Sequence, residues 1–286
     1  MFRLKETSIY RGALLMLISA LCFTVMNIQV KFLKNLEYSA YQLVFFRSLG
    51  SFMLTLGYLW YHKIDFKGSQ PKLLWARGIV GVTSMLLYFK SMSYLPIGTA
   101  VSLRYVSPIF AVIWAVLFLK EKIKAIQWLY FFTAFLGVLC IKGVDADVPL
   151  IGVLLVLISA FFGGLVFVLI SKIGKKDHPV VIINYFMGIA TLIGLLLSYF
   201  DWKTPLNLQE LLMLFSLGVF GYFGQLLMTK ALQSEKSSVI VPLKYVEVIF
   251  TMFVGVVYFE DTYTFVGVIG TLLVIIALYL NLRTKA

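Results

Sequence analysis

The chain has 286 residues, of which 61% are hydrophobic and only 13% are charged. Its mean hydropathy of +0.94 lies outside the range of soluble domains and predicts an integral membrane protein. The net charge of +12 does not indicate a nucleic-acid partner, because the basic residues gather in the connections between apolar stretches.

Ten apolar stretches follow one another along the chain. At about 1.5 Å per residue, each is long enough to cross a hydrocarbon core of about 30 Å. Lipid offers backbone amides no partner, and the alternating pattern of membrane β-strands is absent, so we expect an all-α membrane protein with ten transmembrane helices. The first stretch is too long for a cleaved signal peptide and is expected to remain as a helix. The stretches are residues 12–33, 38–61, 72–93, 97–119, 124–142, 149–172, 178–199, 209–231, 237–259 and 264–283.

The second half of the chain repeats the first at an offset of 140 residues, as from Gly12 to Gly152. Residues 12–20 read GALLMLISA and residues 152–160 read GVLLVLISA, while VSLRYV at 101–106 matches VPLKYV at 241–246. Each copy holds five predicted helices, an odd number, so the second copy enters the membrane from the opposite side. We therefore expect two inverted five-helix repeats, residues 1–145 and 146–286, a construction common in secondary transporters.

Lysine and arginine are unevenly distributed over the predicted connections. The side that holds both termini carries most of them, for example Lys120, Lys122 and Lys124 after the fourth stretch. The positive-inside rule then predicts a multi-pass protein of the cell (inner) membrane with both termini in the cytoplasm.

Two cations occupy equivalent positions in the two repeats and each precedes a tyrosine: Arg104 with Tyr105, and Lys244 with Tyr245. Each lies about 10 Å from its nearer membrane face. A charge inside the bilayer costs about 2.5–3.5 kcal/mol, so it marks a cavity or a buried partner. Recognition of an anionic group is one interpretation, because guanidinium binds carboxylate or phosphate bidentately. The other is neutralisation of protein carboxylates, and for Lys244 the partner would be Glu247, three residues further on.

Other polar groups inside the stretches extend the candidate site. Glu247 is a candidate for proton coupling, with a structural ion pair as the alternative. Asn27, Tyr88 and Gln225 are candidates for substrate binding, although such groups more often form hydrogen bonds between helices.

Four further cations are expected to have gating or structural roles. Arg47 contacts either substrate or a neighbouring helix. Lys90 and Lys230 are equivalent positions near helix ends, where they extend to the interface or form a symmetric gate. Arg77, near the start of its stretch, is expected to be an interfacial anchor.

The ten-helix plan with two repeats resembles the EamA type of the drug/metabolite transporter superfamily over essentially the whole chain. The local matches are Phe45-Phe46-Arg47, residues 103–108 (LRYVSP) and residues 119–122 (LKEK). The second copy departs from them, with Met187 in place of Arg47, Val248 in place of Pro108 and Glu260-Asp261 in place of Lys120-Glu121. The resemblance implies a carrier or exporter of small metabolites without naming its cargo.

No nucleotide-binding loop, dinucleotide fingerprint or HExxH motif is present, and Cys22 and Cys140 suggest neither a disulfide framework nor a metal cluster. We expect no catalytic residue, cofactor or metal. The leading hypothesis is a carrier of an organic anion or zwitterion. The second is a proton-coupled exporter of amino acids or other neutral to cationic metabolites. An intramembrane enzyme or lipid scramblase is the alternative of another class. The expected partners are a small-molecule substrate and the lipid bilayer, with a homodimer left open.

Overall fold

The computed structural model describes residues 2–95, 97–142, 149–259 and 265–284. This part of the chain is built from α-helices and short 3₁₀ turns, with no β-strand within it. The α-helices are α1 (Phe2–Asn35), α2 (Ala40–Tyr61), α3 (Pro71–Ser91), α4 (Ile97–Arg104), α5 (Ser107–Leu119), α6 (Ala125–Lys142), α7 (Leu150–Ile173), α8 (Pro179–Ser198), α9 (Leu208–Ser234), α10 (Ser237–Ile240), α11 (Val246–Phe259) and α12 (Phe265–Arg283). The 3₁₀ turns are η1 (Gly174–Lys176), η2 (Tyr199–Asp201) and η3 (Val241–Tyr245).

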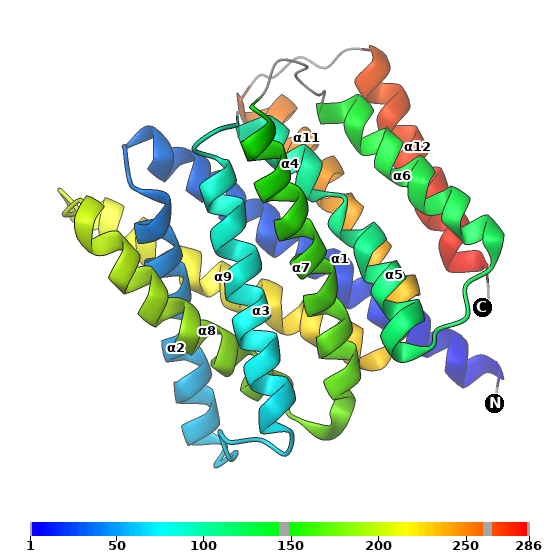
Figure 1. The fold of residues 1–286 in the computed structure, drawn as a ribbon, viewed down its shortest axis with the longest axis horizontal. Coiled ribbons are helices and arrows are strands. Elements are labelled where there is room, and N and C mark those ends of the chain that lie inside the picture. The colour runs from blue at the N-terminus through cyan, green and yellow to red at the C-terminus, as the bar shows by residue number, and fades with distance from the viewer. Residues whose placement is uncertain (1, 96, 143–148, 260–264, 285–286) are drawn as a thin grey trace.

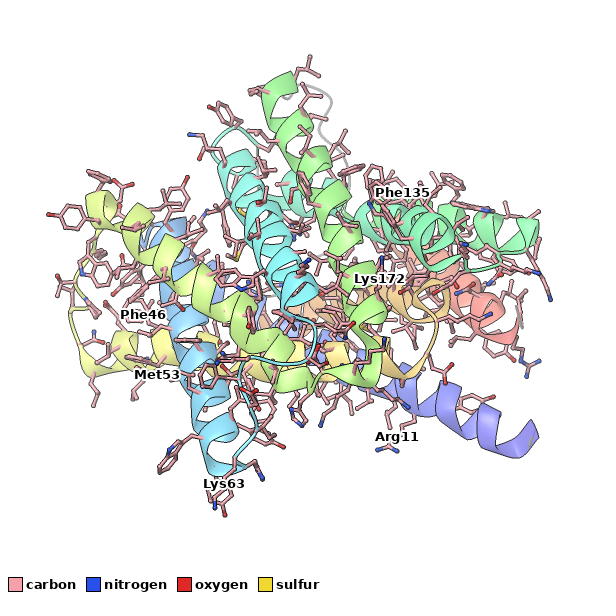
Figure 2. All side chains as sticks on the ribbon, turned by 60° about the horizontal axis from the view of Figure 1, so that its bottom comes forward. Arg11, Phe46, Met53, Lys63, Phe135 and Lys172 are labelled. Carbon is pink, nitrogen blue, oxygen red and sulfur yellow. The ribbon has the colours of Figure 1, made fainter. Side chains whose placement is uncertain are left out.

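Within the described residues, eight helices are long and apolar enough to cross a membrane, and Ala125–Cys140 forms a shorter apolar helix. Large apolar side chains cover the outside of the bundle; Met53, labelled in Figure 2, is 56% exposed. Such a surface is stable in contact with lipid and not with water. The expectation of an all-α membrane protein is confirmed.

Helix starts follow local capping chemistry. The Ser39 side chain accepts a hydrogen bond from the Gln42 amide at the start of α2, and Asn207 does the same for Glu210 in α9. α3 and α8 each begin with a proline, Pro71 and Pro179. In the first turn of a helix the amide hydrogen has no partner within the helix, so its absence removes no hydrogen bond. Most helix ends fall within two or three residues of the predicted limits, but α1 begins about ten residues earlier than expected.

Two stretches expected to be continuous helices are broken at equivalent places. α4 ends at Arg104 and α5 begins at Ser107, while α10 gives way to η3 at Val241 before α11 starts. Pro108 lies in the first turn of α5 and Pro242 in η3. Proline lacks an amide hydrogen and clashes with the preceding turn, which interrupts helical hydrogen bonding. Each half therefore has a discontinuity near its cationic residue, Arg104 or Lys244.

The helices of the two halves pack against each other in an exchanged pattern. Helices α1, α2 and α3 of the first half correspond to α7, α8 and α9 of the second. α1 and α2 pack on α9, and the equivalent helices α7 and α8 pack on α3. In addition, α2 packs on its counterpart α8, and α6 packs on its counterpart α12. Figure 1 shows α6 and α12 side by side at one edge of the bundle. Exchanging the halves converts the α1–α9 pair into α7–α3 and the α2–α9 pair into α8–α3, and it leaves α2–α8 and α6–α12 unchanged.

One hydrogen bond repeats across this arrangement at the offset of 140. Ser19 Oγ of α1 donates to the Gly224 carbonyl of α9 at 2.7 Å, and Ser159 Oγ of α7 donates to the Ser84 carbonyl of α3 at 2.6 Å. A serine that bonds a neighbouring backbone brings two helices close together, and both copies use it.

Polar contacts join the halves at both ends of the bundle. At one end, Glu121 after α5 accepts hydrogen bonds from the Ser237 and Ser238 amides at 2.9 and 3.0 Å, capping α10. At the other end, Gln42 Nε2 donates to the Lys203 carbonyl at 2.6 Å. We call these the Glu121 end and the Gln42 end. The connection 174–178 lies at the Glu121 end, because Ser171 Oγ near the end of α7 lies 2.6 Å from Ser237 Oγ. The connection 62–70 joins it there, since Asp177 accepts hydrogen bonds from the Ser69 amide and from Gln70.

The α2–α9 crossing provides a stability test. A Cβ added at Gly218 would lie 2.5 Å from the Gly50 Cα, so the Gly218→Ala variant must separate two helix backbones. We expect a loss of about 1–3 kcal/mol, seen as a lower melting temperature in detergent. Gly57 on α2 has nothing within 4 Å of an added Cβ, so Gly57→Ala serves as the control and should melt at or slightly above the wild-type temperature. Equal melting of both variants would contradict the close crossing.

Candidate functional site

A cavity of about 600 Å³ lies between the two halves. Its lining comes from α1, α2, α3, α4, α5, α7, α8, α9, η3 and α11, so nearly every helix of the bundle contributes to it. The lining reaches Lys34, Asn35 and Met92, at the Gln42 end. Residues of the connections at the Glu121 end are not part of it. The cavity therefore extends from the middle of the bundle toward the Gln42 end.

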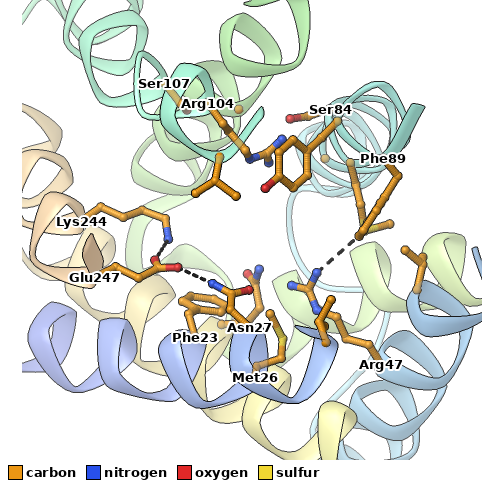
Figure 3. A pocket seen from close by; sticks show the side chains of 18 of the residues that line it. Phe23, Met26, Asn27, Arg47, Ser84, Phe89, Arg104, Ser107, Lys244 and Glu247 are labelled. Carbon is orange, nitrogen blue, oxygen red and sulfur yellow. Dashed lines mark hydrogen bonds and ion pairs between the residues drawn. The ribbon is translucent and has the colours of Figure 1, made fainter. Parts of the chain in front are cut away.

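Arg104 is held at the end of α4 by an aromatic ring and a hydroxyl. Its guanidinium carbon lies 4.2 Å from the centre of the Tyr88 ring, and Nη1 donates to Ser159 Oγ at 2.5 Å. Stacking on Tyr88 fixes one face of the guanidinium and leaves its edges available for bonds in its plane. Arg104, labelled in Figure 3, and Tyr88, both predicted from the sequence, thus form one unit in the cavity wall.

Lys244, Glu247 and Asn27 form a second unit on the facing wall (Figure 3). Lys244 Nζ lies 2.8 Å from Glu247 Oε2, and Asn27 Nδ2 donates to Glu247 Oε1 at 2.7 Å. The ammonium also lies 4.6 Å from the centre of the Phe23 ring. Lys244 and Glu247 therefore form the ion pair that was the alternative to anion recognition by Lys244. Their charges largely cancel.

Arg47 and Arg77 add two guanidinium groups to the lining. Arg47 Nη1 lies 3.9 Å from Met85 Sδ, a weak acceptor. Arg77 is only 1% exposed, and its Nη2 donates to Gln225 Oε1 at 3.3 Å. The expectation that Arg77 is an interfacial anchor was wrong. Gln225 lines the cavity as predicted, but it serves as the acceptor for Arg77.

A sequence signal for Arg77 existed. Arg77, Gly81, Ser84 and Tyr88 follow the spacing i, i+4, i+7 and i+11, which places them on one face of α3. Because Tyr88 was already a candidate, the same face pointed to Arg77. However, Arg77 lies near the end of the predicted stretch, where long side chains usually extend to the interface. This position favoured the interfacial interpretation over a place in the cavity.

Tyr105 and Tyr245 meet near the centre of the bundle, with ring centres 6.1 Å apart. Tyr105 belongs to the cavity lining, whereas Tyr245 is fully buried and lies outside it. Tyr245, which the sequence predicted to bind substrate, therefore does not reach the cavity. Lys90 and Lys230 are exposed and also lie outside the lining, positions that suit interfacial cations.

The charges of the cavity are unequal between the halves. Arg47, Arg77 and Arg104 all come from the first half, and the equivalent positions of Arg47 and Arg77 are Met187 and Leu217. Among the described residues that line the cavity, Glu247 is the one carboxylate, and it forms an ion pair with Lys244. The cavity thus carries an excess of positive charge on a frame that is otherwise repeated.

An apolar helical bundle with a charged cavity between two similar halves defines the class of multi-pass membrane transporters. The sequence profile of the EamA-like transporter family matches residues 10–143 and again 150–283. The chain belongs to this family, whose members are transporters of the drug/metabolite type.

Curated relatives carry transporter names. The pseudopaline exporter CntI of Pseudomonas aeruginosa is 26% identical over 275 residues, which cover 96% of each chain. Human solute carrier family 35 member G1 is 28% identical over 92% of this chain and 76% of its own. A riboflavin transporter of Vibrio cholerae is 27% identical over 63% of this chain and 60% of its own. The names of these relatives and of the family indicate a transporter rather than an enzyme.

A protein of known crystal structure shares the fold. It superposes with a TM-score of 0.83 at 14% sequence identity, covering 96% of this chain and 99% of the other. At that identity the likeness concerns the fold alone.

The ion pair can be tested by removing its partners one at a time. The Lys244→Met variant leaves Glu247, which is 6% exposed, as a buried charge without its cation. We expect a loss of about 3–5 kcal/mol and a clearly lower melting temperature in detergent. The double variant with Glu247→Gln should recover most of the loss, because the remaining amide is neutral. A double variant that melts at or below the single variant would contradict the pairing.

Proposed function

We propose that the chain is a secondary transporter that moves a small organic anion or zwitterion across the membrane by alternating access. The observation that carries the proposal is the charge of the cavity. Arg47, Arg77 and Arg104 are present with one described carboxylate, Glu247, whose charge Lys244 already neutralises. Positive charge in a low-dielectric cavity attracts and retains anions.

The proposed topology has ten transmembrane spans in two inverted repeats, residues 1–145 and 146–286. Counting each broken helix as one span, together with the shorter helix Ala125–Cys140, gives five spans in each half. An odd number of spans inverts the second half. The exchanged helix contacts and the repeated serine bond support a pseudo-twofold axis between the halves.

We further propose that the protein lies in the inner membrane with both termini and the Glu121 end in the cytoplasm. Lys63, Lys67, Lys120, Lys122 and Lys175 belong to connections at that end, as the positive-inside rule requires. The cavity then faces the outside, and alternating access requires a second state that opens toward the cytoplasm. Substrate and bilayer are the partners of this function.

The second candidate is an exporter of amino acids or other neutral to cationic metabolites, coupled to protons through Glu247. The carboxylate is buried at the cavity wall, which favours it. However, a cationic substrate would have to displace Lys244, and protonation of Glu247 would remove its ion pair with Lys244. We therefore place this candidate second.

Transport by the purified protein in proteoliposomes tests the proposal. We expect saturable uptake of radiolabelled organic anions and no uptake of organic cations. Arg104→Gln should raise the KM for the best anion about 10- to 100-fold, since a charge-assisted hydrogen bond contributes about 1.5–3 kcal/mol. Arg104→Lys should recover only part of the affinity, because an ammonium cannot bind bidentately.

Two controls accompany this assay. Lys230→Gln removes an exposed cation outside the cavity lining and should leave KM unchanged. Fluorescent lipid in the same vesicles reports scramblase activity. Unchanged KM in Arg104→Gln, a preference for organic cations, or lipid movement without solute uptake would each contradict the proposal.

A further inference from the structure

Two guanidinium groups in the cavity are incompletely bonded. Nε and Nη1 of Arg77, and Nε of Arg47, are buried and have no hydrogen-bond partner among the described residues. Arg77 as a whole is 1% exposed. Guanidinium has five N–H donors, and a buried charged donor without an acceptor is costly. Strong donors at this place are therefore left without a protein acceptor among the described residues.

The acceptors that these arginines do have are neutral and weak. Arg77 bonds to the Gln225 amide oxygen at 3.3 Å and Arg47 to the Met85 sulfur at 3.9 Å. Within the described part of the chain, neither forms an ion pair with a carboxylate. Glu247 is committed to Lys244 and Asn27, so the protein itself supplies no counter-charge here.

Both side chains reach the same two helix segments. Arg47 contacts Met85 on α3, and its Nε lies 3.4 Å from the Cβ position of Gly221 on α9. Arg77 lies against Gly81 on α3 and bonds to Gln225 on α9. Gly81 and Gly221 are equivalent positions in the two repeats, and the lack of a side chain at each leaves space for a guanidinium. The two cations thus converge between α3 and α9.

Arg77 is oriented in the same way as Arg104. Its guanidinium carbon lies 4.3 Å from the centre of the Phe186 ring, as that of Arg104 lies 4.2 Å from Tyr88. In both cases an aromatic ring holds the guanidinium face, and its donors are left to bond in the plane. A carboxylate or phosphate, whose two oxygens can accept a pair of parallel N–H bonds, is the group that such donors bind best. Figure 3 shows Arg47 and Arg104 extending from different helices toward the same space.

We propose that Arg47 and Arg77 form a second anion subsite, separate from Arg104, and that the substrate is an organic polyanion with at least two acidic groups. One acidic group binds at Arg104 and another between Arg47 and Arg77. The shared chemistry is an oxyanion on a small organic body, supplied by a carboxylate or a phosphate ester. This inference rests on the proposed function and specifies its substrate class.

Binding by a series of probes of increasing charge tests the subsite. The purified protein in detergent is titrated with butyrate, succinate, tricarballylate and 3-phosphoglycerate, and the rise in melting temperature gives a half-maximal concentration for each. We expect the three polyanions to bind at least tenfold more tightly than butyrate. Equal binding of tricarballylate and 3-phosphoglycerate would support recognition of charge. A difference between the two would support the subsite and identify its preferred oxyanion.

Variants separate the two subsites. Arg77→Gln and Arg47→Gln should weaken the polyanions tenfold or more while leaving butyrate unchanged, whereas Arg104→Gln should weaken all four probes. Lys230→Gln, an exposed cation outside the lining, should change none of them. In case the arginine variants do not fold, Met85→Glu places a carboxylate beside Arg47. It should raise the melting temperature of the empty protein and abolish the preference for polyanions.

The outcomes distinguish this inference from the proposed function. If butyrate and the polyanions bind and are transported equally well, the second subsite is refuted and the anion transporter stands. Equal weakening of butyrate and succinate by Arg77→Gln would also refute it. If no anion binds or is transported, both proposals fail together.

Discussion

The hydrocarbon core of a bilayer offers no hydrogen-bond partner and does not solvate charge, and the organisation of this protein depends on that constraint. Backbone amides must be satisfied within each segment, which accounts for the helical fold. Polar side chains must find partners inside the bundle, and they do so across helices, as with Ser19 and Gly224 or Asn27 and Glu247. The buried guanidinium groups of Arg47, Arg77 and Arg104, which form no ion pair with a carboxylate among the described residues, line the cavity, where a ligand can reach them.

A repeated frame and an unrepeated set of charges coexist in the bundle. The helix pairs, the serine–carbonyl bonds, the broken helices and the two glycines at Gly81 and Gly221 all obey the offset of 140. Arg47 and Arg77 do not, because Met187 and Leu217 stand at their equivalent positions, whereas Arg104 is matched by the cation Lys244, which Glu247 neutralises. Packing constrains both copies equally, because equivalent helices must approach each other closely in both halves. Ligand recognition needs only one copy, so cavity positions are free to differ.

The candidate site was partly predictable from individual residues. Arg104, Tyr88, Asn27, Gln225, Lys244 and Glu247 are polar groups deep inside apolar stretches, and the structure brings all six to one cavity. The i+3 spacing already suggested the Lys244–Glu247 pair, which forms at 2.8 Å. Its position equivalent to Tyr105 predicts that Tyr245 binds substrate, but the two rings pack against each other and of the two only Tyr105 reaches the cavity. Arg77 was missed because depth along a helix does not reveal how far a cavity extends.

The sequence alone determined the membrane environment, the helical class, the repeat and the approximate ends of the helices. These depend on composition and on local periodicity, which the chain carries at each point. Only the tertiary structure decided which cations share a cavity, which one is neutralised and which donors remain unused. Arg77 meets Gln225 across 148 positions of sequence, and Asn27 meets Glu247 across 220. Such distant contacts form when the two halves pack together and α3 meets α9 and α1 meets α11. No local pattern in the sequence encodes them.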